Sequence, residues 1–166
     1  MSTSLVSLAA LVSAFNPVTP QLRVAAIVVQ QGRILLVEHR KRAQRYWVLP
    51  GGRLQGNETL DAALRRELSE ELGLDARVGR LVILCETLAP DRHIVNLIYQ
   101  AEIGEKTEPR LDRSDPVLAG WQWVSVDQLP RLDFRPPIAD AVREVIAEKF
   151  SGAVRVLGDT WRPEPR

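Results

Sequence analysis

The sequence predicts an α/β protein of the α+β kind, in which a central mixed sheet carries a helix on each face. The first observation is size: 166 residues, 45% hydrophobic and 26% charged, are typical of one globular domain. The second is order: strand-like runs come first, a long amphipathic segment interrupts them, and strand-like runs resume. The third is a second amphipathic segment that follows the last strand-like run. This order is neither regular strand–helix alternation nor all-β.

The first twenty residues predict an N-terminal extension and linker, residues 1–20, ahead of the domain at residues 21–150. Residues 5–15 form an apolar run that is too short to span a bilayer. No Lys or Arg precedes this run, whereas a secretory signal begins with positive charge. We therefore expect a cytoplasmic protein without membrane contact. The run predicts a short helix that docks on the domain or on a second subunit, as in a homodimer, and Pro17 and Pro20 mark a linker.

Before the long helix, the sequence predicts a hairpin, a basic loop and a short strand that a Pro-Gly-Gly triplet breaks. After the helix, it predicts three more strands, a second helix and a loosely held tail. These elements are, in order, the hairpin at 23–37 with its turn at Gln31-Gly32, the loop at 40–45, the strand at 46–49 ended by Pro50-Gly51-Gly52, strands at 77–86 and 93–103, a polar connection at 104–116, a strand at 121–124, a turn at 126–130, a helix at 138–150 and the tail at 151–166.

The long amphipathic segment predicts a helix at residues 58–72. Leucine recurs at every fourth position from Leu60 to Leu72, which makes one apolar ridge on a helix. Gly73 follows directly and ends the helix as a left-handed cap. The ridge therefore faces the core, and the charged residues between the leucines face away from it.

Charge and composition exclude several kinds of function. Lys and Arg number 22 against 21 Asp and Glu, a net charge of +1, which argues against binding nucleic acid through bulk charge. The single cysteine, Cys85, excludes an intramolecular disulfide and an all-cysteine zinc site. His39 and His93 are the only histidines, too few for a His-rich metal centre. Any metal must therefore be held by carboxylates.

Glu67, Glu70 and Glu71 are spaced i, i+3 and i+4, so on a helix they project from one face as neighbours. Like charges so placed repel, by about 0.2–0.5 kcal/mol per pair on an exposed helix. They also lie near the helix C-terminus, where the helix dipole disfavours anions. A solvated acidic face is the plain interpretation of such a triplet. A hard divalent cation such as Mg²⁺ or Mn²⁺ would instead turn the repulsion into binding.

The surrounding residues favour the metal-binding interpretation. Gly51-Gly52 lets the backbone approach closely, so that a carbonyl can reach a metal. Glu58 lies about two helical turns before Arg66 and can brace it. From Gly52 to Leu74 the chain resembles the signature of the Nudix hydrolase family: Gly, five residues, Glu, seven residues, Arg-Glu, an aliphatic residue, any residue, Glu-Glu, any residue, Gly, aliphatic. Every fixed position of that signature is filled.

The resemblance implies an α/β/α sandwich and an enzyme that needs Mg²⁺ or Mn²⁺ and cleaves a nucleoside diphosphate linked to another group. It implies that the Gly51 carbonyl and the carboxylates of Glu67, Glu70 and Glu71 form the metal shell. It further implies that Arg66 orients Glu67 and that Glu58 holds Arg66. These roles suit phosphoanhydride cleavage, which needs charge neutralisation and a positioned nucleophile.

The general base is left open between two positions. Glu67 is one candidate. In several family members the base instead lies on the loop before the last strand, and here that loop offers Glu108, Asp112 and Asp115. Asp115 is our first choice among the three, and the alternative is that all three are turn or solvation residues.

Substrate contacts are predicted less directly. Tyr46 or Trp47 could stack on a base, although Trp47 suits core packing equally well. Arg40 in the basic loop could meet a phosphate, unless the loop is simply solvated. His93 could meet a phosphate or ribose, although a structural hydrogen bond is the favoured interpretation for it. Pro90 lies sixteen residues after Leu74, near the spacing at which ADP-ribose pyrophosphatases carry a proline.

Three functions follow as expectations. The first is hydrolysis of an ADP-sugar such as ADP-ribose to AMP and a sugar phosphate. The second is a (deoxy)nucleoside triphosphate pyrophosphohydrolase that sanitises the nucleotide pool. The third is a non-catalytic nucleotide-sensing module, against which the intact Glu67, Glu70 and Glu71 argue.

Overall fold

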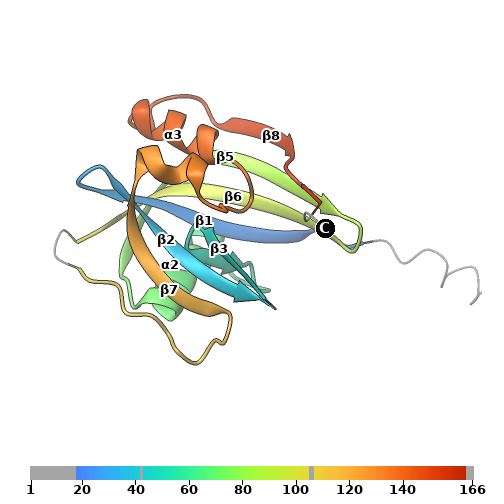
Figure 1. Cartoon of the computed structure of the whole chain (residues 1–166), viewed down its shortest axis with the longest axis horizontal. Coiled ribbons are helices and arrows are strands. Elements are labelled where there is room, and N and C mark those ends of the chain that lie inside the picture. The colour runs from blue at the N-terminus through green and yellow to red at the C-terminus, as the bar shows by residue number, and fades with distance from the viewer. Residues whose placement is uncertain (1–17, 42, 105–106, 164–166) are drawn as a thin grey trace, which may run out of the picture.

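The computed structural model describes residues 18–41, 43–104 and 107–163. Its strands form a central sheet, with α3 above it and α2 below it in the view of Figure 1. The element order is β1 (Gln21–Gln30), β2 (Arg33–Lys41), β3 (Gln44–Val48), β4 (Gly51–Arg53), α2 (Leu60–Leu72), β5 (Ala76–Ala89), β6 (Arg92–Ile103), β7 (Leu118–Ser125), the 3-10 helix η1 (Val126–Arg131), α3 (Ala139–Ala147) and β8 (Arg155–Asp159).

The sheet contains both parallel and antiparallel pairs, and its strands β1 and β2 separate from each other beyond their turn. Its main order is β3-β2-β1-β6-β5-β8, with β4 added to β1 and β7 added to β2. β1 runs parallel to β6 and antiparallel to β4. β1 and β2 pair only beside their turn, at Val29 with Ile34 and at Gln30 with Arg33. Beyond that point the two strands separate, because each takes other partners.

Each face of the sheet buries its own core, which confirms the prediction of a helix on each face. Along β1, Val24, Ala26 and Val28 face α2, whose Leu64 and Leu68 are fully buried. Ile27 points to the other side and packs in the core beneath α3, together with residues such as Val142. The alternation along β1 therefore sets the α/β/α layering.

Helix α2 begins and ends where its cap residues place it. The Thr59 side chain accepts a hydrogen bond from the Ala62 N–H at 3.2 Å. Glu58 lies outside the helix and accepts a hydrogen bond from the Gln55 N–H, so the helix starts two residues later than predicted. Gly73 adopts φ 62° and donates its N–H to the Ser69 carbonyl at 2.9 Å, as a left-handed cap does.

In the region before α2, one prediction was wrong and one strand was missed. Residues 40–45 are not a loop throughout: β2 continues to Lys41 and β3 begins at Gln44, with Arg40 opposite Arg45. The repulsion between these arginines is offset by an ion pair of Arg45 with Glu38 at 3.0 Å. The short strand ends at Val48, before the Pro-Gly-Gly triplet, as predicted, but a further strand that was not predicted, β4, starts at Gly51 and pairs with β1.

The predicted loose tail was wrong for residues 155–159, which form β8 and pair in parallel with β5. Arg155 fixes this strand to α3 through ion pairs with Glu144 at 2.8 Å and Glu148 at 2.6 Å. The prediction for residues 5–15 falls outside the described residues. Within the described part of the chain, no helix is long and apolar enough to cross a membrane.

Candidate active site

Arg66 lies at the centre of a carboxylate network on the outer side of α2. Its Nε and Nη2 donate to the two carboxylate oxygens of Glu58 at 3.0 and 2.8 Å, a bidentate pair. Its Nη1 donates to Glu67 at 2.9 Å and to Glu70 at 3.0 Å. Its Nη2 also reaches the Arg53 carbonyl at 3.1 Å. One guanidinium therefore holds three carboxylates and ties α2 to β4.

The Glu67 carboxylate packs directly against Gly52. A Cβ placed on Gly52 would lie 2.2 Å from one Glu67 carboxylate oxygen and 2.4 Å from the other. No side chain fits in that space, so only glycine leaves room for the carboxylate. The Glu67 side chain is accordingly only 14% exposed. This contact fixes its carboxylate beside the start of β4.

Glu71 lies on the other side of the same turn and contacts Gly51. The Gly51 N–H donates to the Glu71 carboxylate at 3.0 Å, and the Gly51 carbonyl accepts a hydrogen bond from Arg23 at 3.3 Å. The pKa of Glu71 is raised to about 7, mainly by burial; the Gly51 N–H and Arg23 act to lower it, and the charges of Glu67 and Asp115 act to raise it. A carboxylate so placed is stabilised by any cation that enters.

Gly51 can occupy this position only because it has no side chain. Its φ is 138°, and a Cβ there would lie 2.2 Å from the Val24 carbonyl oxygen of β1. The close approach of β4 to β1 therefore turns the Gly51 peptide toward the end of α2. Each glycine of the pair thus contacts one carboxylate: Gly51 contacts Glu71, and Gly52 contacts Glu67.

The loop before β7 crosses the C-terminal end of α2. The Arg110 and Asp112 N–H groups donate to the carbonyls of Leu72 at 2.7 Å and Glu71 at 2.9 Å. This contact brings Asp115 close enough to act on the pKa of Glu71. The Asp115 carboxylate also accepts a hydrogen bond from the Val117 N–H at 2.8 Å, which shapes the turn into β7.

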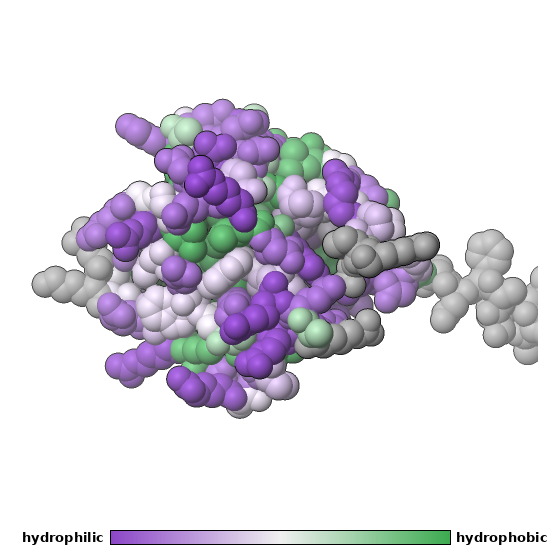
Figure 2. Space-filling model, in the orientation of Figure 1, coloured by the Kyte–Doolittle hydropathy of each residue, from purple (hydrophilic) through white to green (hydrophobic). Residues whose placement is uncertain are grey.

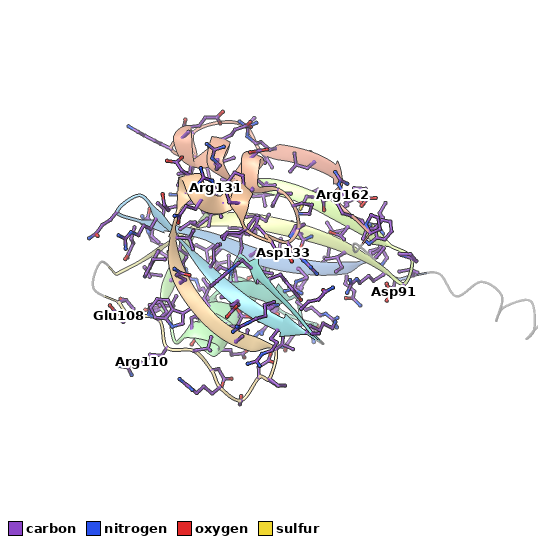
Figure 3. All side chains as sticks on the ribbon, viewed as in Figure 1. Asp91, Glu108, Arg110, Arg131, Asp133 and Arg162 are labelled. Carbon is purple, nitrogen blue, oxygen red and sulfur yellow. The ribbon has the colours of Figure 1, made fainter. Side chains whose placement is uncertain are left out.

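The other two loop carboxylates lie differently. Asp112 accepts hydrogen bonds from the Ser114 N–H and hydroxyl at 2.8 and 2.7 Å, and these bonds lower its pKa. Glu108 is exposed and lies at the outer edge of the molecule with Arg110 (Figure 3). Of the three predicted alternatives, Asp115 is thus the one whose charge acts on a carboxylate of α2.

Two basic residues near this cluster were missed in the sequence. Arg23 alternates with apolar residues along β1, and its burial near Glu71 and Glu67 could not be seen from that pattern. The His39 Nε2 is buried and has no hydrogen-bond partner among the described residues. Burial, together with Arg23, lowers the pKa of His39 to about 4. Arg23 and Asp115 act on both His39 and Glu71, which places His39 at the same site.

The two predicted stacking residues lie on different sides of β3. The Tyr46 ring meets His39 edge-on, with centroids 5.6 Å apart, and the Arg135 guanidinium lies 4.4 Å over its ring. Trp47 packs at the margin of the core beneath α3 and bridges to Phe134. Tyr46 is therefore the aromatic residue that lies beside His39.

The remaining predicted substrate contacts lie on other parts of the sheet. Arg40 is exposed on β2, and its N–H donates to the Val117 carbonyl at 2.8 Å. Pro90 is exposed in the turn between β5 and β6. His93 follows on β6, where its Nε2 lies 2.8 Å from a Glu86 carboxylate oxygen. The structure thus places Pro90 and His93 at the β5–β6 turn, whereas Glu67, Glu70 and Glu71 lie on α2.

The donor chemistry of α2 fits a hard divalent cation, although the side chains are not arranged around one. The described residues contain no group of three or more His, Cys, Asp or Glu side chains set to hold a metal. Glu67 and Glu70 bind Arg66 instead. Glu70 is 58% exposed and can turn away from Arg66, whereas Glu67 and Glu71 are held at Gly52 and Gly51. All of these donors are oxygens, as Mg²⁺ and Mn²⁺ prefer.

Comparison with known proteins agrees with this architecture. The family model described as the NUDIX domain matches residues 19–146. The phosphatase NudJ of Escherichia coli K12 is 30% identical over 129 residues, which cover 75% of this chain and 82% of NudJ.

Two solved structures share the fold. The MutT NUDIX hydrolase from Burkholderia pseudomallei superimposes with a TM-score of 0.63 at 29% identity, covering 76% of this chain and 98% of that one. The E. coli ORF135 protein superimposes with a TM-score of 0.67 at 24% identity, covering 81% and 96%. Nudix enzymes typically use divalent metal ions and act on nucleotide-type substrates. The chain therefore belongs to the Nudix family, as a hydrolase of phosphoanhydride bonds.

Proposed function

We propose that the chain is a Mg²⁺- or Mn²⁺-dependent pyrophosphohydrolase that cleaves a nucleoside diphosphate linked to another moiety, with an ADP-sugar such as ADP-ribose as its first candidate substrate. The observation that carries this proposal is the pairing of Glu67 and Glu71 with the glycine turn of β4. Four carboxylates gather there around Arg66 and Gly51, more negative charge than folding alone requires. A cationic ligand accounts for that excess.

In this proposal Glu67, Glu70 and Glu71 hold the cation with the Gly51 carbonyl, which has a second lone pair beside its bond from Arg23. A bound cation would neutralise charge on the diphosphate and favour attack on phosphorus. Glu58 and Arg66 are positioning residues, since they reach the reacting atoms through Glu67. Glu70 must release Arg66 to take part.

For the base we retain Asp115 as first candidate and Glu67 as the alternative. Asp115 uses one carboxylate oxygen to shape the turn into β7, and its charge reaches Glu71. Its second oxygen is available to accept a proton from a water molecule between the loop and α2. Glu67 already accepts a hydrogen bond from Arg66, so one of its carboxylate oxygens is engaged.

Arg23 and His39 are proposed to contact the phosphates of the substrate. A buried ring nitrogen without a partner costs free energy, so a site that keeps one is expected to satisfy it with ligand or water. The charge of Arg23 acts on His39, and the charges of Glu71 and Glu67 act on Arg23, so both basic residues lie near the carboxylates. Tyr46 and Arg135, beside His39, are then the nearest candidates to contact the nucleoside.

The test is hydrolysis of a substrate panel with Mg²⁺ and with Mn²⁺, with products resolved by chromatography. The proposal expects ADP-ribose to give AMP and ribose phosphate faster than any triphosphate gives pyrophosphate. The second candidate is a (deoxy)nucleoside triphosphate pyrophosphohydrolase. A reversed preference would establish that candidate, and binding without hydrolysis of any substrate would contradict both.

A further inference from the structure

One side of the sheet carries six apolar side chains that belong to neither hydrophobic core. We call them the uncovered face. They come from four adjacent strands, β1, β6, β5 and β8. They are Leu22, Val95, Leu97, Leu84, Leu88 and Val156.

Strand register places these residues on one surface. Leu97 pairs with Leu84, and Leu84 pairs in turn with Val156. Leu22 pairs with Val95. Paired residues of neighbouring strands share a face. The surface continues the side of the sheet on which α2 packs, beyond the end of that helix, since Leu97 also pairs with Val24 beneath α2.

The uncovered face is strongly exposed for apolar side chains on a sheet. Val156 is 74% exposed, Leu88 45% and Leu22 41%. Figure 2 shows a mostly hydrophilic exterior with hydrophobic residues scattered over it. Apolar side chains gathered on one surface usually mark a site that another segment covers. The face is separate from the candidate active site, because it lies on β6, β5 and β8 along one edge of β1, whereas Gly51 and Gly52 of β4 pair with the other edge.

The chain carries an apolar segment that can reach this surface. Residues 5–15 contain nine apolar residues and two serines, and Leu5, Leu8, Val12 and Phe15 are spaced as one stripe of a helix. Residues 16–20 join this segment to β1, which starts at Gln21 opposite Ile94, next to the Leu22–Val95 pair.

The linker and the apolar segment are long enough for the segment to lie across the uncovered face. Five linker residues span at most about 17 Å. A helix of residues 5–15 would be about 16 Å long, and the distance from β1 to β8 across three strand spacings is about 14 Å. We infer that residues 5–15 form a helix that covers the uncovered face of its own chain with the stripe of Leu5, Leu8, Val12 and Phe15.

Thiol labelling of full-length protein at Val156→Cys tests this inference, because the native Cys85 is fully buried and stays silent. The inference expects slow labelling that accelerates at least about tenfold when Leu8→Asp and Val12→Asp are added. Ser7→Asp with Ser13→Asp adds the same charge off the stripe and leaves labelling slow. Asp127→Cys is the control for a general change in labelling rate, because the native Asp127 side chain is 89% exposed and lies away from the uncovered face.

Two results would overturn the inference. Equally fast labelling of Val156→Cys with and without the aspartates shows that the segment does not cover the face. Labelling that slows with protein concentration, in a protein that light scattering finds dimeric, shows that a second copy covers it instead. Concentration-independent protection in a monomer supports packing within one chain.

Discussion

Two arginines of this protein each gather glutamates from a helix, yet the two clusters differ in charge and surroundings. On the α3 side, Arg155 of β8 pairs with Glu144 and Glu148, and both carboxylates are about half exposed. On the α2 side, Arg66 pairs with Glu58, Glu67 and Glu70, while Glu71 adds a fourth carboxylate that is largely buried.

The comparison shows how a structural cluster differs from one suited to a ligand. Arg155 fastens an edge strand to a helix with carboxylates that water also solvates, an arrangement that needs nothing further. The α2 cluster keeps more negative charge than Arg66 and the nearby Arg23 offset, and it holds that charge against two glycines. Such an excess is costly to fold, and a divalent cation offsets the cost.

The largest effect is expected from Glu67→Gln, compared with Glu144→Gln in the other cluster. Glu67→Gln removes a charge from the proposed metal site and is expected to lower kcat by at least about 100-fold. Its melting temperature stays unchanged or rises, because repulsion with Glu71 is relieved. Glu144→Gln is expected to keep full turnover. Steady-state kinetics with thermal unfolding of both variants checks this, and equal activity of the two would remove Glu67 from the reaction.

The next largest effect is expected from Gly52→Ala, which should lower kcat by about 100-fold. The added Cβ would lie 2.2 Å from the Glu67 carboxylate and must displace it. Gly158→Ala on β8 is the matched control, since no atom lies within 4 Å of the Cβ that would be added there. Kinetics of the two folded variants, verified by circular dichroism, provide the measurement. Full activity of Gly52→Ala would show that the position of Glu67 is unimportant.

Arg66→Lys is expected to lower kcat about tenfold with little change in KM. Lysine keeps the charge but cannot form the bidentate pair with Glu58 while also holding Glu67. Arg155→Lys changes the other cluster in the same way and should leave kcat unaltered. If both variants lost activity alike, the loss would reflect general destabilisation rather than the position of Glu67.

The smallest expected effect is that of His39 on the pH dependence of folding stability. Its pKa is lowered to about 4 in the folded protein, from an ordinary value of 6.5, mainly by burial, with Arg23 and Lys41 acting in the same direction and Asp115 against them. Between pH 6.5 and 4 the unfolded chain therefore binds more protons than the folded one, so stability falls as pH falls through this window. His39→Gln should flatten that part of the stability profile in urea unfolding. Parallel profiles would mean that His39 titrates normally.

The local parts of this account could be predicted from the sequence. The leucine ridge from Leu60 to Leu72 and the Gly73 cap fix α2, and residue spacing within the helix places Glu67 and Glu71 near one another. Those features depend on neighbours in the chain. The order of strand-like and amphipathic segments likewise predicted a helix on each face of the sheet.

The remaining parts depend on contacts distant in sequence. Gly51 and Gly52 form a strand only because β1 lies against them, which a Pro-Gly-Gly triplet does not reveal. β8 exists through its pairing with β5 and the link from Arg155 to α3. His39 is half-buried, with Tyr46 opposite it in the β2–β3 hairpin, whereas a basic stretch suggested an exposed loop.

The central claim is that the carboxylates at the end of α2 bind the divalent cation. Crystals grown with Mn²⁺ and a non-hydrolysable α,β-methylene ADP analogue test it through anomalous scattering, which locates manganese directly. The account predicts a peak between Glu67, Glu71 and the Gly51 carbonyl, with Glu70 turned away from Arg66 and the diphosphate in contact with the metal. Manganese found only elsewhere, for example beside Glu144 and Glu148, with the analogue bound away from α2, would contradict it.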